Sequence, residues 1–321
     1  MKVKFWGTRG SIPTPLDAGD VRGKVRRALE KAIEANLDSR EAIESFIDGE
    51  LGTAEAATWG GDTSCVEIEA GEGTRILCDA GTGLRSFGNA ILDSSASDER
   101  LTYHLLMSHF HWDHVMGLPF FTPAYVPGNR IVIHSCHDVA EEAIRSLWGL
   151  PGFPVRFEDL GAEFIFENHQ EGEVFEVDDL RVSAIRQRHA GDSFGYRLEG
   201  RGRKIVYSTD SEHKKDLIRR DYPFLGFIRG VDLLIFDAQY SLEEAVSVKE
   251  DWGHSSNVIG VDLAHRAGVR TLCLFHHEPN YDDDRLQQIL DEAIEYAKEF
   301  EGYVENKVEI ISAWDGLELD V

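Results

Sequence analysis

The sequence predicts an α/β protein in which two β-sheets pack face to face and helices cover their outer faces, a four-layer αββα sandwich. Short apolar, strand-like segments and longer amphipathic segments are interspersed along nearly the whole chain. The 321 residues are 42% hydrophobic and 28% charged, which is typical of a globular protein with a full core. Length alone allows one layered domain or about two smaller units, and we expect a single domain over residues 1–321.

Alternating apolar residues identify the strands. Val3 and Phe5 alternate with charged residues in the first strand. Val66 and Ile68 belong to a second strand that a turn at 71–73 joins to a return strand at 75–78. Further strands are predicted at 101–107, 131–133, 164–166, 180–185, 194–198, 205–207, 233–236, 271–275 and 308–311. Helices are predicted at 138–148, 257–267 and 284–300.

Between the first two strands, at about residues 17–58, the pattern is helical. Apolar residues recur every four positions from Val21 to Leu37, and again from Ile43 to Leu51 after a polar break. We expect an inserted antiparallel hairpin of two helices, each with one apolar stripe. The stripes could cover a functional site as a lid, form the contact of a homodimer, or pack on a sheet of their own.

The charge balance limits the kind of partner. With 33 Lys and Arg against 58 Asp and Glu, the net charge is −25, which excludes a broad basic surface for extended nucleic acid. No window approaches the ~20 apolar residues of a membrane span, and 1–9 carries no apolar signal core. Four scattered cysteines are expected to be buried and reduced. We therefore expect a soluble, cytoplasmic protein.

The segment after the strand at 101–107 carries the clearest chemical signal. His109, His111, Asp113 and His114 bring three imidazoles and a carboxylate into six positions. Neutral histidine nitrogens and aspartate oxygens bind zinc, manganese or iron. In an extended turn His109 and His111 point to one side and can hold one ion, while Asp113 and His114 turn the other way to hold a second.

This His-x-His-x-Asp-His segment resembles the signature of the metallo-β-lactamase superfamily. Other family landmarks match in order: Asp79 after a strand, His189, Asp210 and His276. The resemblance implies the metallo-β-lactamase fold and two divalent ions, with zinc favoured and manganese or iron allowed. It assigns His109, His111, His189 and Asp210 to one ion, and Asp113, His114, Asp210 and His276 to the other. Asp79 would brace the ligand loop by fixing an imidazole.

Within this superfamily the chain is most similar to the ribonuclease Z-like and cyclic phosphodiesterase branch. Asp210 stands where the antibiotic-degrading members typically use Cys, and the Gly-His-Ser-Ser segment at 253–256 resembles a Gly-His-Ser-Thr segment of ribonuclease Z. The segments at 5–11 and 60–65 are also similar to this branch. Two features depart from it: Asp62 stands where Asn is usual, and the helical insertion is long.

The predicted chemistry is hydrolysis. Two ions that share a hydroxide would make water the nucleophile in a displacement at phosphorus, and Asp113 would orient it. His254 is left without a metal, so it is the candidate to protonate the leaving oxygen or to stabilise the transition state. Neighbouring residues at a strand end point apart, so only His276 of the His276 and His277 pair is expected as a ligand. Surface or packing roles are expected for His104, His134, His137, His169, His213 and His265.

The substrate is predicted to be a small phosphodiester, such as a cyclic nucleotide or cyclic phosphate. Ribonuclease Z grips transfer RNA through a Gly- and Pro-rich basic arm, and no such segment is visible in this acidic sequence. A small substrate needs only a pocket and a few cations, for which Arg9 or Arg188 are candidates. Three alternatives stay open: a ribonuclease Z-like endonuclease, a thioester or lactone hydrolase, and a metal-stabilised sensor or scaffold.

Overall fold

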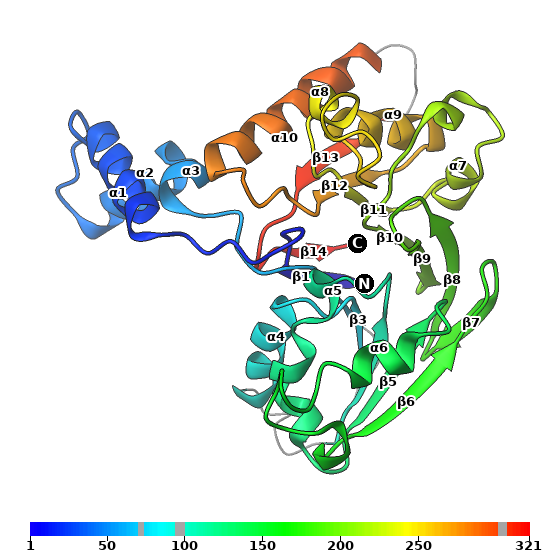
Figure 1. Ribbon diagram of the computed structural model, residues 1–321. Helices are drawn as coiled ribbons and strands as arrows, with labels where there is room; N and C mark the ends of the chain where they lie inside the picture. The colour runs from blue at the N-terminus through cyan, green and yellow to red at the C-terminus, as the bar shows by residue number, and fades with distance from the viewer. Residues whose placement is uncertain (70–73, 94–99, 301–306) are drawn as a thin grey trace.

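The computed structural model describes residues 1–69, 74–93, 100–300 and 307–321. Within these residues two seven-stranded sheets face each other (Figure 1). The first has the order β14-β1-β2-β3-β4-β5-β6, and the second β13-β12-β11-β10-β9-β8-β7. The strands of the first sheet are β1 (Lys2–Gly7), β2 (Cys65–Glu69), β3 (Thr74–Cys78), β4 (Thr102–Leu106), β5 (Arg130–Ser135), β6 (Glu163–Asn168) and β14 (Glu318–Asp320). Those of the second are β7 (Val174–Val177), β8 (Leu180–Gln187), β9 (Ser193–Gly200), β10 (Arg203–Ser208), β11 (Leu233–Asp237), β12 (Thr271–Phe275) and β13 (Glu309–Ser312).

Both sheets are mixed. Strands β3 to β6 run parallel in the first sheet, as β10 to β13 do in the second, and the other neighbours are antiparallel. Because parallel strands end at the same edge of a sheet, the loops after them are brought together there.

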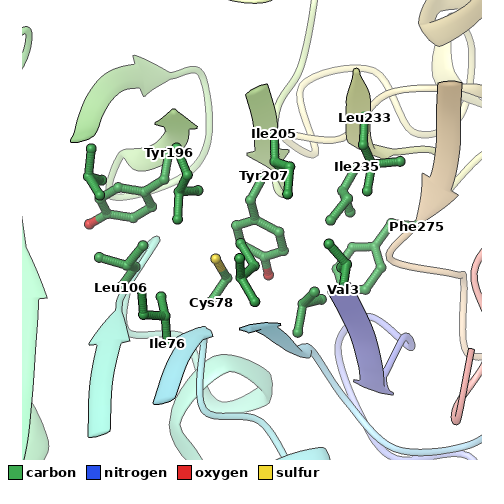
Figure 2. Packing of buried hydrophobic residues seen from close by; sticks show 14 of the residues in the cluster. Val3, Ile76, Cys78, Leu106, Tyr196, Ile205, Tyr207, Leu233, Ile235 and Phe275 are labelled. Atoms are coloured by element: carbon green, nitrogen blue, oxygen red, sulfur yellow. The ribbon is translucent and has the colours of Figure 1, made fainter. Parts of the chain in front are cut away.

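The main core lies between the two sheets. Side chains of the first sheet such as Val3, Ile76 and Leu106 face Ile205 and Leu233 of the second (Figure 2). The strands alternate strictly: in β11, Leu233 and Ile235 join this core, whereas Leu234 and Phe236 face the helices. A strand buried on both faces reads as a continuous apolar run.

Helices form the outer layers. Those against the first sheet are α4 (Gly83–Asp93), α5 (Trp112–Val115) and α6 (Ala140–Arg145). Those against the second are α7 (Pro223–Phe227), α9 (Asn257–Ala267) and α10 (Asp283–Ala297), with the short α8 (Leu242–Ala245) beside α9. Single 3₁₀ turns are η2 (Leu118–Phe120), η3 (Thr122–Tyr125), η4 (Phe157–Asp159), η5 (Lys215–Ile218) and η6 (Lys298–Phe300). The predicted α/β fold with two sheets and outer helices is therefore confirmed.

Most predicted elements are found, with boundaries shifted by a residue or two. The sequence analysis missed β7, β14, α4 and the short helices α3, α5, α7 and α8. The two strands have only four and three residues, too few to show a period. The helix predicted at 138–148 covers only 140–145, and the one predicted to reach residue 300 ends in a 3₁₀ turn. The turn predicted at 71–73 lies outside the described residues.

The insertion contains three helices: α1 (Ala18–Ala32), α2 (Arg40–Glu50) and α3 (Thr53–Ala56). Asp17 and Ser39 cap the first two, since each side chain accepts hydrogen bonds from backbone amides of the first turn. Figure 1 shows the insertion extending sideways beyond the start of α10. Lys24 Nζ lies 2.5 Å from Asp283 Oδ2, and this buried ion pair anchors α1 to α10.

The apolar stripes of the insertion are exposed. Val21, Val25 and Leu29 of α1 and its C-cap residue Ile33 are 50 to 79% exposed, and Ile43 and Ile47 of α2 are 42 and 37% exposed. Helix α1 packs on α3 instead. The expectation that these stripes pack on a sheet is therefore wrong, because the buried residue of α1 is the charged Lys24 rather than one of its apolar residues.

Two simpler expectations can be compared directly. The four cysteines are free; Cys65, Cys78 and Cys273 are buried and Cys136 is partly buried. Among the described helices, none combines the length and the apolar character needed to traverse a bilayer.

Candidate metal centre

The predicted ligands come from loops at the carboxyl ends of strands in both sheets. His109, His111, Asp113 and His114 follow β4 of the first sheet. The ligands from the second sheet are His189 after β8, Asp210 after β10 and His276 after β12. The structure therefore brings together all seven predicted residues, which lie up to 167 positions apart in the sequence.

Four of these residues form a first donor set. His109 Nε2 lies 3.6 Å from Asp210 Oδ2, and His189 Nε2 lies 3.5 Å from the same oxygen. His189 Nε2 is also 3.1 Å from His111 Nδ1. Three imidazole nitrogens and one carboxylate oxygen thus face a common point.

The second donor set lies on the other side of Asp210. His114 Nε2 is 3.2 Å from Asp113 Oδ2 and 3.2 Å from Asp210 Oδ1. His276 Nε2 is 3.3 Å and 3.2 Å from the same two oxygens. Asp210 therefore presents one oxygen to each set, as a residue that bridges two ions must.

These donors fit metal ions. The Nε2 atoms of His109 and His114 are buried without a hydrogen-bond partner in the protein, which is costly unless another ligand satisfies them. Separations of 3.1 to 3.6 Å between donors match a shared ion with bonds of about 2.0–2.2 Å. The buried His and Asp cluster is therefore suited to a binuclear metal site.

The charges of the cluster support the same conclusion. Burial lowers the pKa of His109 well below its usual value, so its imidazole is neutral and able to bind a metal. Burial also opposes the charged form of His114, but the carboxylates of Asp113, Asp210 and Asp79 outweigh it and raise its pKa. Three carboxylates around one imidazole are an excess of negative charge that bound cations would balance.

Asp79 holds the ligand loop in place. Its carboxylate accepts hydrogen bonds of 2.7 Å from the Ser108 backbone amide, the Ser108 hydroxyl and the Tyr207 hydroxyl. It also lies 2.7 Å from Nδ1 of His114, the ring nitrogen that points away from the donor set. A carboxylate in this position fixes the tautomer and the orientation of the imidazole.

Three site residues have left-handed backbone conformations. Asp79, Asp210 and His276 have φ values of 60°, 48° and 61°, and each follows a strand within two residues. Such conformations cost about 1–3 kcal/mol each in a residue other than glycine. Each of these conformations lies at a strand end, where a loop that carries site residues begins.

Sequence analysis missed Asp237, the last residue of β11. Its Oδ2 lies 3.0 Å from His254 Nδ1 and accepts a 2.9 Å hydrogen bond from the Ser211 backbone amide. The available signal was an aspartate directly after the apolar run at 233–236, a position like that of Asp79 after its strand.

The N-terminal loop after β1 supports the second donor set. The Ser11 backbone amide donates a 2.7 Å hydrogen bond to Asp113 Oδ2. Gly10 lies against the His276 ring, and a Cβ atom at this position would come within 2.6 Å of His276 Cε1. Glycine is therefore required at position 10 for the ring to lie where it does.

His254 lies beside both donor sets. Its ring centroid is 5.0 Å from that of His189 and 5.2 Å from that of His276, and its Nδ1 is 3.9 Å from Asp210 Oδ2. Burial opposes its charged form, but the carboxylate of Asp237, with smaller effects of Asp210 and Asp113, raises its pKa to about 9. The neighbouring carboxylates therefore favour the protonated form of the His254 imidazole.

Arg9, one of the two candidates for a substrate-binding cation, is not available for that role. It is 2% exposed, and its Nε and Nη1 donate hydrogen bonds to the backbone carbonyls of Gly60, Glu278 and Tyr281. The guanidinium therefore ties three loops together. His277 faces away from the cluster, with Nε2 2.8 Å from the Ala313 carbonyl oxygen.

Arg188 lies where a substrate cation could act. Its side chain is 60% exposed and pairs with Glu212 and Asp251 at 3.3 and 3.1 Å. Together with Lys214 and His254 it borders a cavity of about 960 Å³. The apolar part of the cavity wall is formed by Leu217, Ile218, Leu242, Ala245, Val246, Val258 and Ile259.

Two facing sheets with a buried His and Asp cluster at their strand ends define a metal-binding hydrolase fold. Residues 74–277 match the family model described as a beta-lactamase superfamily domain. The chain belongs to the metallo-β-lactamase superfamily.

Curated relatives extend this comparison. Ribonuclease Z of Sulfolobus acidocaldarius is 24% identical over 259 residues, which cover 65% of this chain and 80% of that protein. Ribonuclease Z of Kineococcus radiotolerans is 27% identical over 260 residues, covering 69% of this chain and 79% of that protein. The chain is thus a distant homologue of ribonuclease Z.

Solved structures share the fold over the whole chain. The short form of human tRNase Z matches with a TM-score of 0.60 at 19% identity, covering 100% of this chain and 99% of that one. Yeast PDE1 matches with a TM-score of 0.60 at 14% identity over 100% and 99%. Zn(2+)-bound PqqB from Methylobacterium extorquens also gives 0.60 at 14% identity, over 100% of both chains. These identities support the fold and carry no further assignment.

Proposed function

We propose that this protein is a metal-dependent phosphodiesterase that hydrolyses a small substrate, a cyclic nucleotide or a related cyclic phosphate. The observation that carries this proposal is the His254–Asp237 pair beside two donor sets that share Asp210. Two divalent cations held there would supply a water that ionises near neutral pH and would neutralise charge on the phosphate. The chain supplies the groups that position these partners and move protons.

Asp113 and His254 have separate roles in this proposal. Asp113 belongs to the second donor set, and the Ser11 amide fixes its Oδ2, so it orients the attacking water by accepting a hydrogen bond. Asp237 holds Nδ1 of His254, which leaves Nε2 to give its proton to the leaving oxygen as the phosphorus–oxygen bond breaks. An alkoxide leaves poorly without that proton, so His254 would accelerate bond cleavage.

The cavity beside His254 supports a small substrate. Arg188 and Lys214 lie on its rim in partly exposed ion pairs, which contribute little stability and can be exchanged for a phosphate at small cost. The apolar wall offers a surface for a nucleobase or another flat group. The net charge of −25 disfavours a long polyanion.

We propose zinc as the resident metal, with manganese or iron as alternatives. Five imidazole nitrogens and the carboxylates of Asp113 and Asp210 form a mixed donor set that all three metals accept. Zinc is favoured because nitrogen donors predominate. A protein of the same fold, PqqB, has been solved with bound zinc, which is consistent with this choice.

A ribonuclease Z-like endonuclease is the second candidate. The observation that favours it is the homology over about two thirds of the chain to curated proteins of that name. Both candidates cleave a phosphodiester and use the same site residues. They differ in substrate size, since the endonuclease must grip a folded RNA.

One set of assays tests both candidates. The protein, loaded with zinc or manganese, is offered bis(p-nitrophenyl) phosphate, a panel of cyclic mononucleotides and dinucleotides, and a precursor transfer RNA. The proposal expects turnover of the small esters and of at least one cyclic nucleotide, with little cleavage of RNA. Preferred cleavage of RNA would establish the endonuclease instead. Metal-loaded protein inert towards every phosphodiester would contradict both and favour a scaffold or an acyl hydrolase.

A further inference from the structure

A second group of metal-ligating side chains shares no residue with the centre at Asp210. His134 is in β5, Glu167 is in β6, and His169 directly follows β6. The sequence suggested only packing or surface roles for these histidines. In the structure they lie close together because β5 and β6 are neighbouring parallel strands, with His134 opposite Glu167 in the register.

The three side chains offer donor atoms at metal-binding separations. His134 Nδ1 lies 3.0 Å from His169 Nε2 and 3.4 Å from Glu167 Oε2, and His169 Nε2 lies 3.9 Å from that oxygen. A point equidistant from three atoms with these separations is about 2.0 Å from each, which is the length of a zinc bond to imidazole nitrogen or carboxylate oxygen. One ion therefore fits without movement of the donors.

The position of Glu167 distinguishes a metal site from a row of hydrogen-bonded histidines. A carboxylate that accepts a hydrogen bond from a ring N–H lies within about 3.2 Å of the nitrogen. Glu167 Oε2 is farther than this from both nitrogens, yet it faces both. Its side chain is 49% exposed and could turn into solvent. A shared cation gives it a reason to face the two imidazoles.

The surroundings hold both imidazoles in ligand-competent orientations. His134 Nε2 lies 2.8 Å from Nδ1 of His104 in β4, and His169 Nδ1 lies 3.7 Å from Glu173 Oε1. The His169 ring stacks on Phe175 of β7 with 3.6 Å between ring centroids. A hydrogen bond on the outer nitrogen, as at His134, fixes the tautomer of an imidazole at a metal site. Glu173 is too far from His169 for a hydrogen bond, so the stacking on Phe175 is what orients that ring.

We propose that His134 Nδ1, His169 Nε2 and Glu167 Oε2 bind one divalent transition-metal ion of the zinc type, separate from the binuclear centre. Three protein donors leave the fourth position of a tetrahedral ion open. Because Glu167 is half exposed, solvent can reach this position and a water molecule would fill it. The ion would join β5 and β6 next to the connection that leads into β7, where the chain passes from the first sheet to the second. Its role would be to brace that crossover.

Zinc content tests this proposal. The full-length chain is saturated with zinc and dialysed, and zinc per chain is measured by mass spectrometry for wild type, Glu167→Gln, His169→Gln and the control Glu163→Gln. Glu163 is in the same strand and is exposed, but pairs with Arg130 instead. We expect Glu167→Gln and His169→Gln to hold one zinc fewer than wild type and Glu163→Gln. The same difference should persist when Asp210→Asn is added to each chain.

Equal zinc content in all four folded proteins would overturn the proposal and leave a hydrogen-bonded row of histidines. Loss of zinc from Glu163→Gln as well would also overturn it, because the loss would not be specific to the donors. If His169→Gln fails to fold, Glu167→Gln decides alone, since its side chain is half exposed.

Discussion

His254 Nδ1 lies 3.0 Å from Oδ2 of Asp237, at the end of a buried strand. The contact repeats on the second sheet what His114 and Asp79 do at 2.7 Å on the first. In both pairs a buried carboxylate lies within hydrogen-bond distance of Nδ1 of an imidazole and fixes the orientation of the ring. The difference is that His114 Nε2 belongs to a donor set, whereas His254 belongs to neither set in the proposed assignment and can carry a proton.

Replacing His254 with alanine should lower kcat on a phosphodiester by about 10²- to 10⁴-fold, because the leaving oxygen loses its proton donor. Zinc content should not change. The control His265→Ala, which removes a histidine from the outer helix α9, should keep wild-type activity. Loss of zinc from His254→Ala would show that this residue is a ligand instead.

Asp237→Asn should move the alkaline limit of activity to lower pH. In the wild type the carboxylate of Asp237 raises the pKa of His254 against the effect of burial, so it extends the acid form to higher pH. Without the charge, burial dominates and the acid form is lost about one pH unit or more earlier. The profile of kcat against pH, measured with the same metal, checks this. An unshifted limit would mean that another group sets it.

The His254–Asp237 pair should stabilise the folded protein over a defined pH range. Because the folded pKa of His254 lies above the unfolded value of about 6.5, its contribution is complete below pH 6.5 and is lost as the pH rises towards 9. Denaturant unfolding of chelator-treated protein measures this effect. Between pH 6 and pH 9 the free energy of unfolding should fall less in Asp237→Asn than in wild type.

Asp79→Asn should weaken zinc binding by about 10- to 100-fold without removing a ligand, because the His114 ring loses the partner that orients it. Asp210→Ala should be more severe and should reduce occupancy of both positions, since one carboxylate serves both donor sets. Competition with a chromophoric chelator measures both effects. Equal affinities in wild type and Asp79→Asn would contradict this role for Asp79.

Acid should destabilise the chelator-treated protein through buried neutral histidines. Burial lowers the pKa of His213 to about 4 and that of His277 to about 3, below the unfolded value of about 6.5. The unfolded chain therefore binds protons first, and stability falls as the pH drops from 6.5 towards these values. His213 alone accounts for up to about 3 kcal/mol at the acid end. His213→Gln should show a shallower loss between pH 6.5 and 4 in denaturant titrations.

The insertion should tolerate charge on its apolar stripe. Leu29→Glu and Ile33→Glu replace side chains that are 64 and 79% exposed, so each should change the free energy of unfolding by less than about 0.5 kcal/mol. A dimer contact formed by this stripe, which we retain as a proposal, would appear as dissociation of these variants in sedimentation experiments.

Lys24→Ala, in contrast to Leu29→Glu and Ile33→Glu, should strongly destabilise the attachment of the insertion. It leaves Asp283 buried without its partner, a change that costs about 3–5 kcal/mol where a buried pair is broken. It also removes hydrogen bonds to the Ala54 and Ala57 carbonyls. Limited proteolysis should therefore cut the 17–58 segment faster than in wild type. Unchanged cleavage would show that other contacts anchor the insertion.

Much of the fold and of the ligand set could be predicted from local sequence. The alternation of a strand is visible within a few residues, and four of the ligands lie within six residues. Other features depend on contacts between distant segments. The sequence suggests that Arg9 is a free cation, because the carbonyls of 60, 278 and 281 that accept its hydrogen bonds are distant in the chain. The stripe from Val21 to Ile33 has the period of a buried helix face, yet an ion pair through Lys24 fixes that helix in the opposite orientation. His134, Glu167 and His169 are scattered in sequence and meet only through strand pairing.

The ligands of the candidate centre are divided between the two sheets, and this division has a consequence for biosynthesis. A nascent polypeptide that ends at Asn168 contains His109, His111, Asp113 and His114 but lacks Asp210, so neither half of the cage can close during early translation. Hydrolytic competence would arise only once the C-terminal half has emerged and docked. Truncated translation products should therefore be inert, whatever metal the cell supplies.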